Sequence, residues 1–168
     1  MRLDTDRAAA INRAEELFGA IKVIEPTADE LALAAALEYE AQKAIVSLDT
    51  GESQLVAVTI KRPIDFLVTG DKRAILALEQ LLGAVDVLTA IEGRAVCLEQ
   101  LVARLLLVLN PPAVRAGVCS EPSVDTAMTI CFSCGRDGTS PPDWHQGLAS
   151  YVKALRQEAP RILAKCDS

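Results

Sequence analysis

Residues 48–75 read LDTGESQLVAVTIKRPIDFLVTGDKRAI, and this stretch decides which fold we expect. A turn opens it, and residues 52–60 then have the composition of a helix, although their β-branched side chains would also suit a strand. Pro63 breaks this element, and residues 65–69 form an apolar run that is typical of a buried strand. Asp71 begins a further helix. The stretch therefore predicts a helix, a strand and a second helix in succession.

The rest of the chain extends this alternation in its first half and becomes helical in its second half. We predict further helices over residues 6–18, 27–46, 96–109, 124–131 and 144–157, and further strands over residues 21–25 and 85–88. Alternating helices and strands favour parallel pairing. The expected fold class is α/β, a short parallel sheet flanked by helices at residues 1–90, with a helical C-terminal extension at residues 91–168 packed on it.

The composition is that of a single acidic domain. The chain has 168 residues, with 17 Lys and Arg against 23 Asp and Glu and a net charge of −6, which argues against a broadly basic nucleic-acid binder. Its longest apolar run, Leu101–Leu109, is too short to span a bilayer, so we expect no membrane partner. Five cysteines without an export signal predict a cytoplasmic protein with reduced thiols.

Three carboxylates are the first candidates for a functional site. In an α/β unit a helix runs antiparallel to the strand that follows it, so Glu52 and Asp71 are expected at the carboxyl edge of the sheet, with Asp49 nearby. Such carboxylates would bind Mg²⁺ or Mn²⁺, which prefer oxygen ligands and turn water into a nucleophile that attacks a phosphodiester. Lys72 and Arg73 flank these acids and could bind phosphates.

The same residues also have a purely structural interpretation. Asp49 and Glu52 nearly form a capping box, Asp71 suits a helix N-cap, and carboxylates are stabilised at helix N-termini. Lys72 and Arg73 would then be ordinary solvated residues at the start of a helix. The spacing alone leaves both interpretations open.

A family resemblance favours the functional interpretation. Residues 48–57 and 66–72 resemble the second half of a PIN domain, and the resemblance extends over about residues 21–88. PIN domains are metal-dependent ribonucleases with a parallel sheet, and many of them are toxins of bacterial toxin–antitoxin systems. The resemblance implies that two residues are metal-site acids: Glu52, in a Gly-Glu pair that opens a helix, and Asp71, in a Thr-x-Asp sequence after a strand.

The resemblance also implies that the domain is incomplete. PIN domains begin with a hydrophobic strand that ends in an Asp, and they take another acid from an early helix. Here only three residues precede Asp4, too few for a buried strand, and Glu15 or Glu16 is the candidate for the helix acid. We therefore expect a PIN-like protein related to metal-dependent ribonucleases, in which this chain alone cleaves RNA weakly or not at all. The alternative is a non-catalytic module of the same fold, which would bind a protein partner or form a homo-oligomer through its apolar helices.

A third interpretation is a zinc-stabilised helical domain. The side chains of Cys119, Cys131, Cys134 and His145 are of the types that bind zinc. Cys131 and Cys134, however, lie three residues apart at the end of a predicted helix, where free cysteines are commonly buried. We therefore favour buried thiols over a zinc site.

Overall fold

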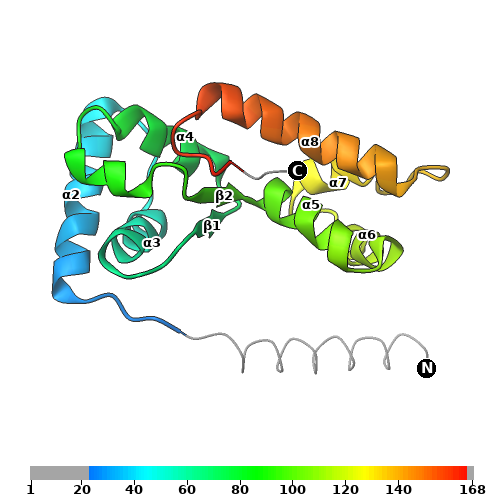
Figure 1. Cartoon of the computed structure of the whole chain (residues 1–168), viewed down its shortest axis with the longest axis horizontal. Helices are drawn as coiled ribbons and strands as arrows, with labels where there is room; N and C mark the ends of the chain where they lie inside the picture. Colours follow the sequence, from blue (N-terminus) through cyan, green and yellow to red (C-terminus); the bar gives the residue numbers. More distant parts are fainter. Residues whose placement is uncertain (1–22, 166–168) are drawn as a thin grey trace.

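The structure, a computed structural model, describes residues 23–165, in which helices surround one short parallel sheet (Figure 1). Strands β1 (Leu67–Thr69) and β2 (Ala95–Cys97) pair in parallel, and a bridge from Ala95 to Leu163 joins the segment after α8 to β2. A short parallel sheet is confirmed, but the partner of residues 67–69 is residues 95–97, in the part of the chain predicted to be helical. The helices are α2 (Ala28–Ala44), α3 (Thr50–Lys61), α4 (Lys72–Leu81), α5 (Leu98–Val108), α6 (Pro111–Ser120), α7 (Thr126–Cys131), α8 (Pro141–Glu158) and the 3-10 helix η1 (Asp86–Ile91).

Local capping sequences begin α2, α3 and α4 close to where they are predicted. Thr27 Oγ1 accepts a hydrogen bond from Glu30 N at 3.4 Å, and the Glu30 carboxylate accepts one from Thr27 N at 2.7 Å, which completes a capping box. Asp49 and Asp71 cap α3 and α4, each accepting a hydrogen bond from a first-turn amide, at 2.9 and 2.8 Å. The stretch after Asp49 is therefore a helix and not a strand.

Two predicted strands are absent from the part of the chain that the structure describes. Residues 85–88 lie largely in η1, which buries Leu88 and Ile91, three residues apart, on one side. A short apolar run of this kind does not distinguish the period of a strand from that of a helix. Residues 23–25 have no regular structure, and the rest of that strand lies outside the described residues, as does the helix predicted at 6–18.

The sequence patterns do not predict β2 and α6. The first residues of the helix predicted at 96–109 belong to β2 instead. Pairing with β1 holds residues 95–97 extended, and α5 begins only at Leu98. α6 begins directly after Asn110, at two prolines. In the sequence these prolines indicate only the end of the preceding helix. Prolines suit the first turn of a helix, whose amides need no partner within the helix. The Asn110 side chain also caps α6 by accepting a hydrogen bond from Ala113 N at 3.4 Å.

The buried apolar side chains form two clusters, and α8 contributes to both. The larger cluster joins α2, α3, α4, the sheet and the segment after α8, with Leu37, Leu78 and Ile162 fully buried. The smaller cluster joins α5, α7 and α8, where the centroids of the Phe132 and Trp144 rings lie 5.6 Å apart. The sheet thus belongs to the larger cluster, and α5 leads from it into the smaller one.

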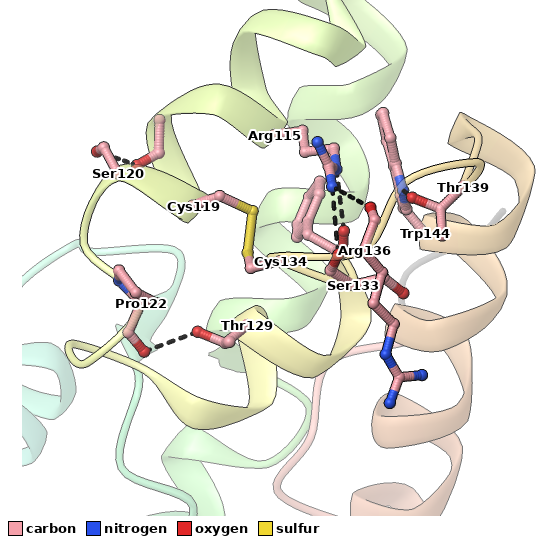
Figure 2. The surroundings of a disulfide bond; sticks show 12 residues. Arg115, Cys119, Ser120, Pro122, Thr129, Ser133, Cys134, Arg136, Thr139 and Trp144 are labelled. Atoms are coloured by element: carbon pink, nitrogen blue, oxygen red, sulfur yellow. Dashed lines mark hydrogen bonds between the residues drawn. A yellow bond between two sulfur atoms is a disulfide. The ribbon is translucent and has the colours of Figure 1, made fainter.

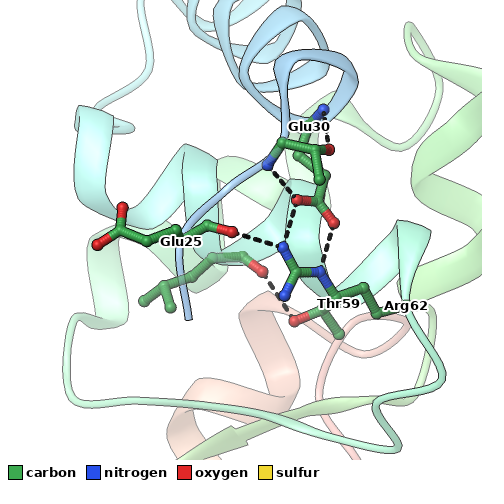
Figure 3. Close-up of polar contacts among 6 residues, drawn as sticks. Glu25, Glu30, Thr59 and Arg62 are labelled. Atoms are coloured by element: carbon green, nitrogen blue, oxygen red, sulfur yellow. Dashed lines mark hydrogen bonds and ion pairs between the residues drawn. The ribbon is translucent and has the colours of Figure 1, made fainter. Parts of the chain in front are cut away.

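An ion pair fastens the start of α2 to the end of α3 (Figure 3). Arg62 donates to both carboxylate oxygens of Glu30, from Nε and from Nη2 at 2.6 Å each, and to the carbonyl oxygen of Glu25 at 2.8 Å. Glu30 is only 3% exposed. The Arg62 guanidinium, together with the Thr27 amide, lowers the pKa of Glu30 to about 2.

The variant Glu30→Gln tests this ion pair through the pH dependence of stability. A depressed carboxyl pKa stabilises the fold above the unfolded-state pKa of about 4.3, and this contribution is lost as the pH falls towards 2. The difference in free energy of unfolding between the wild type and Glu30→Gln should therefore shrink in acid. Urea unfolding at a series of pH values measures it.

The control is Glu40→Gln, which removes an exposed ion pair with Lys43. Exposed pairs contribute little, so its effect should be small at every pH. A Glu30→Gln effect that is equally large at about pH 7 and about pH 3 would contradict the role given to Arg62.

Candidate functional site

Glu52, Thr69 and Asp71 meet at the carboxyl end of β1. Thr69, the last residue of β1, donates its hydroxyl hydrogen to Glu52 Oε1 at 3.0 Å, and the same hydroxyl oxygen accepts a hydrogen bond from Asp71 N at 3.0 Å. Glu52 lies in the first turn of α3, and Asp71 is the N-cap of α4. The Thr69 hydroxyl thus links the carboxylate of Glu52 to the backbone amide of Asp71, at the sheet edge where α/β proteins bind ligands.

Glu52 is the least satisfied of these acids. Its Oε2 atom is buried and accepts no hydrogen bond from any described residue. Burial raises the pKa of Glu52, the hydrogen bond from Thr69 opposes this shift, and the nearby charges of Asp49 and Asp71 add to it. A cation close to Oε2 would relieve both the burial of this charge and the repulsion between the acids.

Asp49 and Asp71 already have partners within the protein. Asp49 Oδ1 accepts a hydrogen bond from Glu52 N at 2.9 Å and so caps α3. Asp71 forms a two-point ion pair with Arg73, whose Nε and Nη2 lie 3.2 and 2.9 Å from its oxygens, and this guanidinium lowers the pKa of Asp71. The Arg73 side chain is exposed, so it can leave Asp71 for a phosphate group.

Lys72 does not point to the same place as Arg73. Its Nζ lies 2.5 Å from Glu99 Oε1 and 5.5 Å from the centroid of the Tyr151 ring. Glu99 follows β2 and is 1% exposed, so Lys72 neutralises a buried carboxylate. The sequence predicts that Lys72 could bind a phosphate, but in this structure its ammonium group is paired with Glu99. Sequence reasoning missed Glu99, because the strand before it looks like the start of a helix.

Glu52 and Asp71 are two carboxylates, fewer than a group of metal ligands normally contains. No group of three or more His, Cys, Asp or Glu side chains within residues 23–165 could hold a metal ion. Mg²⁺ nevertheless keeps several of its waters and often binds through only one or two carboxylates. Glu52 Oε2, which has no hydrogen-bond partner among the described residues, is therefore the first ligand to consider, whereas the Asp71 carboxylate is paired with Arg73.

The four residues of zinc-binding type are not grouped as free ligands. Cys119 and Cys134 form a disulfide, with their Cα atoms 5.3 Å apart, so the expectation of reduced thiols is wrong for this pair. Cys131 is a buried free thiol. The pairing depends on how α6 packs against the segment after α7, which residue spacing does not reveal.

The outer edge of β1 carries an exposed apolar surface. Among the described residues β1 pairs only with β2, so this edge has no partner strand. Phe66 and Val68 are 56% and 47% exposed and border a groove of about 870 Å³, which we call the β1 groove. Ile24, Leu55 and Ile64 also line it, and none of its described lining residues is charged.

Comparison with known proteins found no family model, no curated protein and no solved structure that matches this chain. No helix in the described part of the chain is long and apolar enough to cross a membrane. The function proposed below therefore rests on the geometry of the site and on the motifs in the sequence.

Proposed function

We propose that this chain is a PIN-like protein, related to metal-dependent ribonucleases, which binds Mg²⁺ or Mn²⁺ weakly and by itself cleaves RNA weakly or not at all. The observation that carries the proposal is the buried Oε2 atom of Glu52, which has no hydrogen-bond partner among the described residues and lies where the charge of Asp71 acts on it, at the carboxyl end of β1. A bound ion would lower the pKa of a water molecule and place positive charge against a phosphodiester.

Each residue of the site has its own part in this proposal. Glu52 and Asp71 hold the ion, and Thr69 orients Glu52 through its hydroxyl group. Asp49 fixes the first turn of α3 and adds negative charge that favours a cation. Arg73 neutralises Asp71 in the free protein and would bind an RNA phosphate when an ion takes its place. Two carboxylates bind an ion less tightly than a fuller set, which is the reason to expect weak activity.

Removing either acid should weaken metal binding and abolish any cleavage. Glu52→Gln and Asp71→Asn keep the side-chain shapes and remove one of two carboxylate ligands, so each should weaken Mn²⁺ binding at least about ten-fold, or about 1.4 kcal/mol. Mn²⁺ titration followed by electron paramagnetic resonance measures the binding. Labelled single-stranded RNA, incubated at the same Mn²⁺ concentrations, measures cleavage.

Asp65→Asn is the matched control, because Asp65 is an exposed acid at the opposite, amino end of β1. It should leave Mn²⁺ binding unchanged. Equal Mn²⁺ binding in all four proteins would remove the proposed metal site. Robust cleavage by the wild type would contradict the expected weak activity, and cleavage that survives both substitutions would place the active site elsewhere.

The β1 groove favours a second candidate function, a non-catalytic interaction module. An unpaired strand edge presents backbone amides and carbonyls that a further extended segment can bind, and native proteins usually protect such edges with charges or prolines. Here Leu67–Thr69 contains neither, and the groove beside it is apolar. A second copy of the chain, paired edge to edge through β1, would cover both features.

Charged side chains at this edge should disrupt such self-association. We expect the wild type to form a concentration-dependent dimer, and Phe66→Asp and Val68→Lys to weaken it at least about ten-fold, because each places a charge in the apolar contact. Sedimentation velocity over a range of protein concentrations measures the dimer. Leu107→Lys, at an exposed apolar position on α5, is the control and should have no effect. A wild type that stays monomeric throughout would rule out pairing through β1.

A further inference from the structure

The disulfide Cys119–Cys134 attaches the end of α6 to the segment between α7 and α8 (Figure 2). Cys119 is the penultimate residue of α6, and Cys134 follows α7 by three positions. Both residues are partly exposed and pack at the border of the smaller apolar cluster, not at its centre. The bond therefore joins a helix to a loop at the surface of the molecule.

Apart from the disulfide, α6 packs shallowly on the smaller apolar cluster, through the partly buried Val114 and Val118. None of its residues is buried, in contrast to α5, α7 and α8 on the same side of the molecule. A hollow of about 230 Å³ lies under it, lined chiefly by apolar side chains that include Leu98, Val102, Val118 and Met128. A helix that buries so little has a low local stability.

The polar contacts of Arg115 attach α6 to the same segment as the disulfide. Arg115 donates from Nε to the carbonyl oxygen of Phe132 at 3.0 Å, and from Nη2 to those of Ser133 and Arg136 at 3.2 and 3.0 Å. Its guanidinium also lies 5.7 Å from the centroid of the Trp144 ring. Once the sulfur–sulfur bond is open, α6 depends on these exchangeable contacts and on the partly buried side chains that face the hollow.

The two free cysteines of the described chain differ from this pair. Cys97 and Cys131 are 1% and 4% exposed, and burial raises the pKa of each thiol to about 11. Thiol exchange requires the thiolate form and access to the sulfur, and both cysteines lack these at neutral pH. Among the cysteines that the structure describes, exchange is therefore confined to Cys119 and Cys134.

We propose that Cys119–Cys134 is a reversible thiol–disulfide site, and that its reduction by a dithiol releases α6 from the apolar hollow that it covers. One thiolate of the dithiol attacks a sulfur of the bond, which forms a mixed disulfide and frees one cysteine. The second thiol of the dithiol then displaces the other cysteine. The dithiol is oxidised to a disulfide, and its two electrons and two protons end on the thiols of Cys119 and Cys134. Neither step depends on the proposed metal site.

Hydrogen exchange of the full chain tests the proposal. The oxidised protein is compared with protein reduced by dithiothreitol, and exchange is read by mass spectrometry of peptides. Amides of residues 113–120 should exchange at least about ten-fold faster in the reduced protein, while those of α2 and α3 keep their rates, since the disulfide lies far from them in the fold. Alkylation of the reduced protein should label Cys119 and Cys134 before Cys97 and Cys131.

The paired variant Cys119→Ser with Cys134→Ser should show fast α6 exchange without any reductant. Cys131→Ala, which leaves the pair intact, is the control and should keep the full redox response. Equal α6 exchange in the oxidised and reduced wild type would overturn the release of α6, whether or not the paired variant folds. A peptide mass that shows Cys131 bonded to Cys134, or failure of the bond to re-form after the dithiol is removed, would overturn the assignment of a reversible Cys119–Cys134 site.

Discussion

Replacing Lys72 with methionine is expected to lower the free energy of unfolding by about 3–5 kcal/mol, because it leaves the carboxylate of Glu99 charged and without its cation. Glu99 is 1% exposed, and its Oε1 atom lies 2.5 Å from Lys72 Nζ. Urea unfolding near neutral pH measures the loss.

Two further proteins make this test specific. Adding Glu99→Gln to Lys72→Met should recover part of the lost stability, since no buried charge remains. Lys61→Met removes an exposed lysine from the end of α3 and should change stability by no more than about 0.5 kcal/mol. A Lys72→Met effect as small as that of Lys61→Met would show that the pair with Glu99 does not stabilise the fold.

Phe132→Ala should be comparably destabilising, by about 3–5 kcal/mol, because it opens a cavity at the centre of the smaller apolar cluster. Phe132 is fully buried and packs against Trp144. Thermal and urea unfolding measure the loss, and the fluorescence of Trp144 reports the change at the site itself. Phe66→Ala is the matched control, since it deletes the same atoms from an exposed ring at the β1 edge and should change stability by about 0.5 kcal/mol or less. Equal losses in the two variants would contradict the position of Phe132 in the core.

Helix starts are the part of the fold that could be predicted residue by residue. The capping box of Thr27 and Glu30 and the caps formed by Asp49 and Asp71 involve residues two or three positions apart, so the sequence contains all of their information. The same holds for the candidate acids. Glu52 and Asp71 follow from one topological rule, that a helix and the strand after it run in opposite directions.

Elements that depend on distant partners could not be predicted in this way. Residues 95–97 are extended because they pair with β1, and Ala95 also forms a bridge to Leu163. Residues 86–91 instead form a 3-10 helix, which places the side chains of Leu88 and Ile91 in the larger apolar cluster. Short apolar segments have no preference strong enough to resist such tertiary contacts.

The sequence by itself determined where the capped helices begin, that residues 67–69 form a strand, and which two acids follow from it at the carboxyl edge of the sheet. Only the tertiary structure decided that one Glu52 oxygen is buried without a hydrogen-bond partner among residues 23–165, that Lys72 pairs with Glu99, and that Cys119 bonds to Cys134. The physical reason is the range of the interactions. Capping and turn geometry act within one turn of chain, whereas burial, ion pairing and disulfide formation depend on side chains that only packing brings together.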